Sequence, residues 1–509
     1  MANRYIEAAR VYHEVTKHSY TSVRSSPHYL DWDIRPAAYK IYPDAGALAL
    51  PRELELSAIP TLEAIGANPA LSTDAAVGIE ALTRILFCTG GLTRSKRVGG
   101  EDYHFRAAAS AGALYPVEMY VASGEVEGLE PALYHFSPAD LKLRGLRRGD
   151  WRAMLARATA GRPSIARARA IVIFTSIFWR SAWKYRARAY RYCFWDVGTM
   201  LANLLVAACA EGIGLEIFTA FVDSELDALL GLDPDREGCA ALVALGASAD
   251  APGVSPAHDA FPFEAIPLSA REVTYEALVK FNRETRLESE AEVAAIADAT
   301  LDAAVLQTTS SGLLKFDPIM PENALGLGET ILRRGSTRRF ARAAIRAEEL
   351  QAIAESARMN WRADFAPIID VYLIVNAVDR MTPGAYFFDR EARAFELIRA
   401  GEFRGEAGYL CLEQPLGMDC SALIVYMADL ERALAASGNR GYRNAHLEAG
   451  ILGGRAYLAA YALGRGATGL TFYDDDTSRF LTPHAAGKSP ILMVAVGVPH
   501  ATIAEEALR

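Results

Sequence analysis

The sequence predicts an α+β protein in which two copies of one domain pack as a pseudo-twofold dimer within a single chain. Three observations lead to this prediction. The sequence matches itself over long stretches at an offset of 252 positions, both copies give the same order of elements, and helices and strands mix without strict βαβ alternation. Two fused copies most simply pack as the subunits of a symmetric dimer do.

The offset is clearest in one helix and its exit, where glycines keep the same spacing in both copies. Glycines that hold one register across a helix and the following turn are unlike a chance match. The matched pairs are Gly198 with Gly450, Gly212 with Gly464, Gly214 with Gly466, and Asp196 with Glu448.

Each half reads as an amphipathic helix, two strands, an apolar strand, a long helix and a closing strand. The long helices are apolar nearly all round, as buried central helices are, and each ends in Gly-x-Gly, a left-handed helix stop. The expected elements are helices at Ala76–Leu86 and Ala347–Ala357, first strands at Val117–Ala122 and Ile369–Val375, apolar strands at Ile171–Thr175 and Leu423–Met427, long helices at Asp196–Ala210 and Glu448–Leu463, and closing strands at Ala241–Gly246 and Ile491–Gly497.

Four segments follow from this pattern. Prolines between the halves mark a linker, and a charged helical stretch, Ala270–Ala304, follows it. The predicted divisions are an N-terminal extension at 1–60, a first domain at 61–250, a linker and helical connector at 251–320, and a second domain at 321–509.

Composition excludes several classes of protein. The chain has 509 residues and a net charge of −9, which argues against a nucleic-acid binder. The start lacks a signal-peptide core, and the most apolar run, Met200–Val222, is broken by Glu211 and Glu216, so no membrane segment is expected. The six cysteines are scattered without a C-x-x-C pair, so we expect no metal site and a cytoplasmic location.

The second copy opens with RRGSTRRF, residues 333–340. Four arginines with Ser336 and Thr337 near a helix form a natural anion cradle, because guanidinium groups and hydroxyls match phosphate oxygens. A solvated basic turn is the alternative. In the first copy, aligning Ser72-Thr73 with Ser336-Thr337 puts Ala70 opposite Arg334 and Asp74 opposite Arg338, so that copy lacks the cations.

The second copy in turn lacks a loop that the first copy has. The first copy carries FRAAASAGALYPVE, residues 105–118, just before its first strand, and the second has only ARMNWRADFAPIID there. Small residues let backbone approach a flat ligand closely, and Ser110 adds a hydroxyl donor. One interface of the pseudo-dimer would therefore combine Arg334, Ser336 and Arg338 with Ser110 and Gly112. The prediction is one competent site per chain.

These motifs together resemble the nitroreductase superfamily of α+β flavoproteins, whose FMN lies in the dimer interface. YHEVTKHSY (residues 12–20), LDWDIRP (30–36) and WKYRARAYRYCFWDVG (183–198) resemble, more specifically, SagB/ThcOx-type dehydrogenases. The resemblance covers most of the chain and implies two nitroreductase-like domains fused in tandem. Thr199 departs from the D-x-G-H pattern of that family, which has histidine there.

The resemblance also implies roles for individual residues. FMN phosphate and ribityl would be held at the RRGSTRRF motif, the small-residue loop would come from the other half, and a Lys-Tyr pair would serve catalysis. The residues matched to FMN binding are Arg334, Ser336, Arg338, Arg106, Ser110, Ala111, Gly112, Gly469, Leu470 and Lys488, and those matched to catalysis are Lys184 and Tyr185.

The leading hypothesis is an FMN-dependent dehydrogenase that oxidises a thiazoline or oxazoline in a modified peptide or a similar heterocycle. FMN would take the hydride and oxygen the electrons, while Lys184 acts as base and Tyr185 as hydrogen-bond donor or proton relay. A partner enzyme of a biosynthetic complex is possible. Two alternatives remain open: an NAD(P)H-dependent nitroreductase or flavin reductase, and a non-catalytic partner in a peptide-modifying complex.

The stretch Leu141–Cys193 has 14 Lys and Arg residues against one acid, with aromatic residues interleaved. It could guide an acidic peptide, dock RNA, or consist of structural arginines that balance acidic helices. Two other motifs do not meet the requirements of the sites they suggest. GRGATG (464–469) follows a helix and so is a helix stop, not a dinucleotide fingerprint. His13 and His18 are five residues apart and would not share a helix face, so zinc is not expected.

Overall fold

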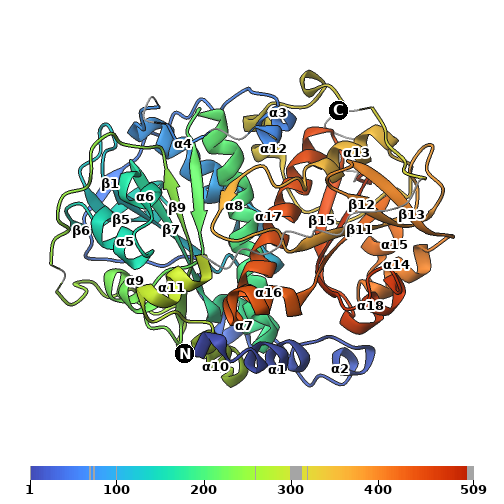
Figure 1. The fold of residues 1–509 in the computed structure, drawn as a ribbon, viewed down its shortest axis with the longest axis horizontal. Coiled ribbons are helices and arrows are strands. Elements are labelled where there is room, and N and C mark those ends of the chain that lie inside the picture. Colours follow the sequence, from blue (N-terminus) through green and yellow to red (C-terminus); the bar gives the residue numbers. More distant parts are fainter. Residues whose placement is uncertain are drawn as a thin grey trace.

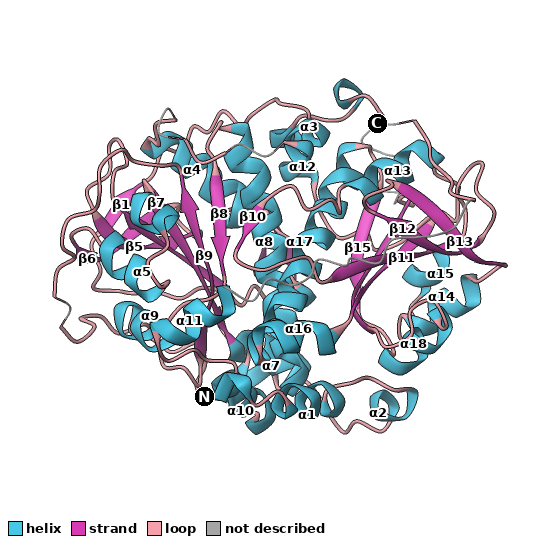
Figure 2. Ribbon diagram, in the orientation of Figure 1, coloured by secondary structure: helices cyan, strands magenta, loops and turns pink. Residues whose placement is uncertain are grey.

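In the computed structural model, two sheet-containing lobes flank a central pair of long helices (Figures 1 and 2). The first half of the chain forms one lobe and the second half the other, so the α+β class and the internal pseudo-dimer are confirmed. The structure describes residues 2–67, 70–72, 75–98, 100–257, 259–297, 312–317 and 319–500.

The two main sheets share one strand order. Along the first sheet the order is β1 (Ala47–Ala49), β6 (Lys142–Arg148), β5 (Ala132–Ser137), β4 (Val117–Ser123), β7 (Ala170–Ile177), β9 (Glu237–Leu245), β8 (Leu215–Phe218) and β10 (Arg362–Ala363). Along the second it is β13 (Ala394–Ala400), β12 (Gly384–Asp389), β11 (Ile369–Val375), β14 (Ala422–Ala428), β16 (Ser489–Gly497) and β15 (Gly466–Leu470).

The pairing register of equivalent strands is the same in the two sheets, as their strand order is. Tyr120 on β4 pairs with Ile173 on β7, and Tyr372 on β11 pairs with Val425 on β14, at the same offset of 252 positions. These strands are buried, so a slip of one residue would turn every apolar side chain to the wrong face. The predicted duplication is therefore preserved down to single residue pairs.

The central helices are α8 (Ala189–Ala210) and α17 (Asn439–Ala462), and both begin earlier than the sequence predicts. The first turns that the prediction left out hold arginines and tyrosines. They are helical and buried because they have partners: Arg191 donates to Asp474 at 2.8 Å, and Arg440 pairs with Asp223. The predicted helix stops are confirmed, since Gly212 and Gly464 both have φ of +69°.

The helices α8 and α17 touch backbone to backbone where Gly198 meets Gly450. A Cβ on Gly198 would lie 2.3 Å from the carbonyl oxygen of Leu447 and 2.6 Å from the Cα of Gly450. A Cβ on Gly450 would lie 2.4 Å from the carbonyl oxygen of Trp195. The two halves meet at this distance only because both positions are glycine.

Other helices cover the sheets and the central pair. The predicted helix at 76–86 is α4 (Ile79–Gly90), and that at 347–357 is α13 (Ala347–Glu355). The rest are α1 (Glu7–Val15), α2 (Tyr20–Arg24), α3 (Thr61–Gly66), α5 (Arg152–Ala158), α6 (Pro163–Arg167), α7 (Phe178–Tyr185), α9 (Asp223–Leu230), α12 (Leu327–Arg333), α14 (Arg404–Leu410), α15 (Pro415–Asp419), α16 (Leu430–Ser437) and α18 (Asp474–Leu481). Short 3-10 helices lie at Ala2–Arg4, Trp32–Ile34, Ala111–Ala113, Arg186–Arg188 and Pro321–Asn323.

The predicted charged helical stretch contains two short helices, α10 (Glu276–Glu284) and α11 (Glu290–Ala297). The end of the predicted stretch Ala270–Ala304 lies outside the described residues. The N-terminal segment and α10 pack together, with the ring of Tyr12 stacked on that of Phe281 at 4.4 Å.

The basic stretch 141–193 is largely structural. Arg188 and Arg191 both pair at 2.8 Å with Asp474 of the second half, and Arg180 pairs at 2.5 Å with the buried Glu118. Burial alone would raise the pKa of Asp474, but the two arginines hold it at about 2. These cations balance buried acids, as the structural interpretation of the stretch predicts.

Among the described residues, one helical stretch, 178–210, is long and apolar enough to cross a membrane by length and composition. Within this stretch, 83% of the 18-residue window that meets the criterion is buried inside the fold, as in a core helix.

Gly198→Ala should destabilise the protein, because the new methyl group would overlap backbone atoms of α17 that cannot rotate away. We expect a loss of about 1–3 kcal/mol or more in the free energy of unfolding, measured by urea denaturation. Gly405→Ala, in α14 with nothing within 4 Å of the new Cβ, should change stability by no more than about 1 kcal/mol and in the favourable direction. Equal midpoints for both variants would contradict the backbone contact.

Candidate active site

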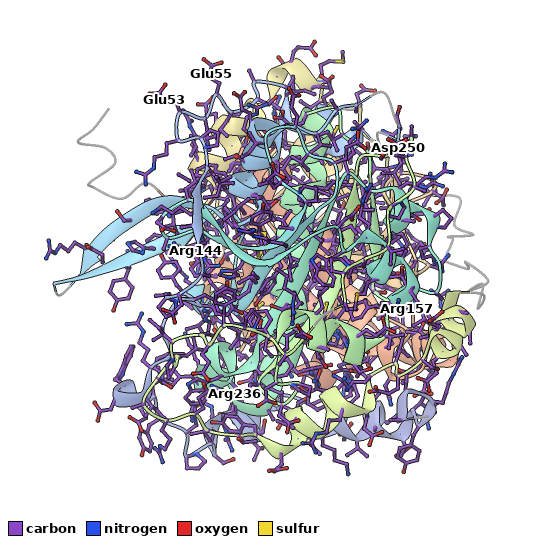
Figure 3. All side chains as sticks on the ribbon, turned by 90° about the vertical axis from the view of Figure 1, so that its left-hand side faces the viewer. Glu53, Glu55, Arg144, Arg157, Arg236 and Asp250 are labelled. Atoms are coloured by element: carbon purple, nitrogen blue, oxygen red, sulfur yellow. The ribbon has the colours of Figure 1, made fainter. Side chains whose placement is uncertain are left out.

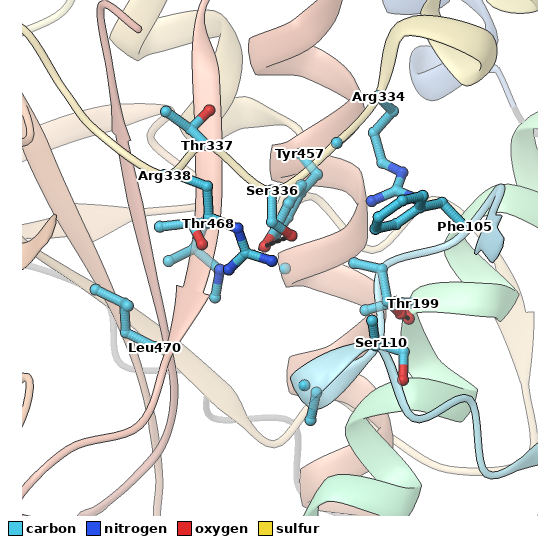
Figure 4. A pocket seen from close by; sticks show the side chains of 18 of the residues that line it. Phe105, Ser110, Thr199, Arg334, Ser336, Thr337, Arg338, Tyr457, Thr468 and Leu470 are labelled. Atoms are coloured by element: carbon cyan, nitrogen blue, oxygen red, sulfur yellow. Dashed lines mark hydrogen bonds between the residues drawn. The ribbon is translucent and has the colours of Figure 1, made fainter. Parts of the chain in front are cut away.

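A cavity of about 1650 Å³ lies between the two halves. The first half contributes the small-residue loop, the end of α7 and a projecting hairpin, β2 (Leu92–Val98) and β3 (Glu101–Arg106). The second contributes the segment after α12, strand β15 and α17. Figure 4 shows the facing walls, with Ser336, Arg338 and Tyr457 across from Ser110 and Thr199.

The structure brings most of the predicted site residues together in this cavity. Its lining includes Lys184, Tyr185, Ser110, Ala111, Gly112, Arg334, Ser336, Arg338, Gly469 and Leu470. The first five come from one half and the last five from the other, so the predicted cross-half arrangement is what the chain folds into. Their functional roles stay predictions.

Two predicted residues do not line the cavity. Arg106 is buried behind the loop and donates to the carbonyl oxygens of Val117 at 3.3 Å and Ala38 at 2.8 Å. The ammonium of Lys488 is held by the carboxylate of Asp370 at 2.5 Å, away from the segment that carries Ser336. Neither side chain is placed to hold a ligand in the cavity, because each has a structural partner elsewhere.

Arg334 reaches across the interface. It donates to the carbonyl oxygens of Arg106, Ala107 and Ala108 at 2.5, 2.8 and 3.1 Å, and Figure 4 shows it directed toward the strand that carries Phe105. Its guanidinium therefore fastens the base of the small-residue loop to the second half. Arg338, which has no such carbonyl partners among the described residues, points into the cavity.

Asp196 fixes the small-residue loop from below. Its carboxylate accepts hydrogen bonds from the hydroxyl of Ser110 at 2.5 Å and the backbone N–H of Ala111 at 2.9 Å. Thr199, which stands where the resembled family has histidine, donates to the carbonyl of Ala109 at 2.6 Å and so adds a second contact from α8 to the loop. Burial raises the pKa of Asp196 to about 7 against the effect of these bonds.

Lys184 and Tyr185 end α7 beside Gly112. A Cβ on Gly112 would lie 2.6 Å from the hydroxyl of Tyr185 and 3.2 Å from the ammonium of Lys184, and the φ of +65° also favours glycine. Partial burial, then the nearby Arg338, lowers the pKa of Lys184, whereas burial raises that of Tyr185. The pair thus combines an amine that loses its proton more readily than usual with a phenol that keeps its own.

At the opposite interface the equivalent site is closed. There the segment equivalent to the loop forms β10, which pairs in parallel with β8. The carboxylate of Asp364 accepts from the backbone N–H groups of Thr219 and Ala220 at 2.8–2.9 Å. Trp361 and Arg455 leave a space of only about 20 Å³. One open cavity faces one filled interface, in agreement with the predicted reciprocal loss.

The structure also corrects the alignment of the RRGSTRRF motif. The helices α3 and α12 occupy equivalent places, and the residues that cap them are Ala67 and Arg334. Ala67, not Ala70, therefore stands opposite Arg334. Thr73 and Asp74, which the alignment also used, lie outside the described residues. The first copy still lacks the cation.

Several cavity residues were missed from the sequence. The hydroxyl of Tyr457 on α17 accepts the N–H of Gly469 at 2.5 Å and lies 3.3 Å from the hydroxyl of Ser336. The guanidinium of Arg94 lies 3.6 Å from a Cβ placed on Gly335. The basic run at residues 94–97 could have marked the hairpin as part of the site. The sequence held no such mark for Tyr457, because its counterpart 252 positions earlier is Leu205.

The sequence model of the nitroreductase family matches this chain twice, at residues 72–247 and 331–498. The chain belongs to the nitroreductase family. Members of this family typically bind a flavin. The two matches correspond to the two lobes.

Individual nitroreductase relatives agree. A Methanocaldococcus jannaschii protein named as a nitroreductase, MJ1384, is 30% identical over 149 residues, which cover 29% of this chain and 72% of the relative. The crystal structure of an Anabaena variabilis protein described as a nitroreductase superposes with a TM-score of 0.76 at 27% identity, covering 97% of this chain and 99% of that one. The whole two-lobed architecture is therefore shared.

Two further relatives are processing proteins. The trifolitoxin-processing protein TfxB of Rhizobium leguminosarum bv. trifolii is 28% identical over 31% of this chain and 44% of its own length. The microcin B17-processing protein McbC of Escherichia coli is 24% identical over 25% of this chain and 49% of its own length. The chain thus matches about half the length of each.

Asp196→Asn should change how stability depends on pH. Between about pH 4 and pH 7 the folded protein keeps the Asp196 proton while the unfolded chain releases it, so the wild type loses stability as the pH rises through this window. An asparagine can keep both loop contacts without titrating. Melting temperatures from pH 4 to 8 should therefore fall less steeply for the variant. The exposed Asp44→Asn control should follow the wild type, and parallel curves for all three proteins would refute the assignment.

Proposed function

We propose that this nitroreductase-family chain binds one FMN in the open cavity and oxidises a thiazoline or oxazoline ring of a modified peptide. The single observation that carries the proposal is that Lys184 and Tyr185 of one half face the same cavity as Ser336, Arg338 and Gly469 of the other. The likeness to two processing proteins, TfxB and McbC, supports a peptide as the substrate class. It also favours SagB/ThcOx-type dehydrogenases within the family.

The cavity residues fit FMN in size and chemistry. Arg338, Ser336 and Arg94 would hold the phosphate, because they supply two cations and a hydroxyl around Gly335. No described strand pairs with the outer edge of β15, whereas the equivalent edge of β8 is covered by β10. At the edge of β15 the N–H of Gly469 donates to the hydroxyl of Tyr457, which itself lines the cavity, and the small-residue loop opposite would allow a flat ring to approach closely.

When bound, FMN supplies the hydride acceptor, with oxygen as the final electron acceptor. The chain supplies the proton chemistry. Nζ of Lys184 takes the proton from the ring carbon, and its lowered pKa makes the neutral amine that this step needs easier to form. The hydroxyl of Tyr185 stays protonated and donates to the ring nitrogen, and Gly112 leaves room for both groups. Arg334 and Asp196 keep the loop in place.

The second candidate is an NAD(P)H-dependent nitroreductase, which the family membership and the MJ1384 match favour. Anaerobic addition of NAD(P)H distinguishes it. Rapid loss of the flavin absorbance would favour the reductase, and inertness toward NAD(P)H would favour the dehydrogenase.

Flavin released from the denatured protein should be FMN at one equivalent per chain. Replacing Ser110–Ala113 by a two-residue linker should abolish binding, because it removes the wall contributed by the first half. Trp361→Ala, at the closed interface, is the control and should leave one equivalent bound. Two equivalents in the wild type would refute the single-site proposal, and no flavin even after FMN is added would favour a non-catalytic partner.

Lys184→Ala should keep FMN and lower kcat for azoline oxidation by about 10²-fold or more, the usual contribution of a general base. The surface variant Lys142→Ala, whose ammonium pairs with Asp140, is the control and should keep full activity. Arg338→Gln should raise the pKa of Lys184, so in protein saturated with FMN the acidic limb of kcat moves to higher pH. Full activity of Lys184→Ala with FMN bound would exclude the base assignment.

A further inference from the structure

The charge of the cavity is opposite to that of the chain. The chain carries −9, yet among the described residues that line the cavity there is one carboxylate, Asp196, which is turned toward Ser110 and Ala111 of the loop. The cationic residues of the lining are Arg94, Lys96, Lys184, Arg333, Arg334, Arg338 and Arg339. A phosphate needs only two or three of them, so positive charge remains for a second anionic ligand.

The remaining cations come from different halves of the chain. Lys96 is exposed on the β2–β3 hairpin of the first half, which is the blue two-stranded ribbon that projects on the left of Figure 3. Arg339 is exposed on the segment after α12 of the second half. Neither side chain forms an ion pair with any residue that the structure describes. Salt screens the attraction between exposed charges beyond about 10 Å, so these two cations attract a ligand only at close range.

Space is available beside the cofactor. Ligand pockets usually hold about 300–1,000 Å³, and this cavity has about 1650 Å³. Next to Lys184 in the chain, outside the cavity lining, Trp183 packs edge-on against Trp32, which is 60% exposed, with the ring centroids 5.1 Å apart. The guanidinium of Arg35 lies over Trp32 and over Tyr103 of the hairpin, at 5.7 and 5.2 Å, so this aromatic pair is continuous with the hairpin.

We propose that Lys96 and Arg339 bind acidic side chains on the two sides of the reacting ring in an extended peptide substrate. This inference deepens the proposed function and rests on it, because the ring must reach Lys184. The cations come from separate halves of the chain, and an extended strand, at about 3.3 Å per residue, can present a carboxylate to each. Exposed cations of this kind give specificity and a salt-dependent affinity.

Binding is tested without turnover on the FMN-loaded protein. Two fluorescent peptides carry the same thiazole, one flanked by Asp and Glu and the other by Asn and Gln, and anisotropy gives both Kd values. We expect the wild type to bind the acidic peptide at least tenfold more tightly, and this preference should fall as NaCl rises from 50 to 500 mM. Equal affinities in the wild type at low salt would overturn the inference.

The variant Lys96→Glu/Arg339→Glu should lose the preference and retain its flavin absorbance. Its control, Lys280→Glu/Arg148→Glu, changes charge equally at exposed positions outside the cavity and should keep the preference. A variant that still prefers the acidic peptide, or one that only raises the KM for NADPH, would overturn the inference. If the wild type binds the acidic peptide selectively but oxidises no azoline, the function fails and the binding surface stands.

Discussion

The backbone contact between α8 and α17 fixes the distance between the halves, and the cavity depends on that distance. Gly198 and Gly450 allow the helices to touch, so the loop on one half can reach the motif on the other. Arg334 then spans the remaining gap to three loop carbonyls. A bulkier helix crossing would separate Ser110 from Ser336 without altering either sequence motif.

Duplication gave the chain two equivalent interfaces, and the direction of one contact shows how they diverged. At the open site, Arg334 follows α12 and donates to the carbonyls of the loop. At the closed site, Asn360 of the loop equivalent donates back to the carbonyls of Ile65, Gly66 and Ala67 at the end of α3, at 2.9–3.1 Å. The short side chain of Asn360 thus holds the loop equivalent close to α3, and β10 covers the edge of β8. Once covered, that edge has no backbone groups left for a ligand.

The repeat made much of the fold predictable. The order of the elements along the chain, the two central helices and their glycine stops follow from patterns that one chain shows twice. Helix starts were harder, because Arg191 and Arg440 look exposed in sequence and become buried only through Asp474 and Asp223. Such partners lie more than 200 residues away, beyond the reach of local periodicity.

Residues of the candidate site were predicted where a sequence motif contains them. They were missed where only the folded structure brings them to the cavity. Lys488 fitted a family position, yet a nearby carboxylate, Asp370, captures it. The role of Asp196 could not be read from its apolar helix. It became clear only when the loop folded over it, because the same burial that raises its pKa also places two hydrogen-bond donors against it.

Fusion removes a constraint that a homodimer must obey. In a symmetric dimer, a residue that improves one site appears in both, and a residue that helps a large substrate enter must also fit the second copy. In this chain the hairpin and the segment after α12 each serve one cavity, so Lys96 and Arg339 can be added without a matching charge at the closed interface. Trp361 and Arg455 can likewise fill the other side. The filled interface then contributes packing, and the open one can become large and cationic. A cavity of this size within a buried interface is therefore compatible with a stable pair of lobes.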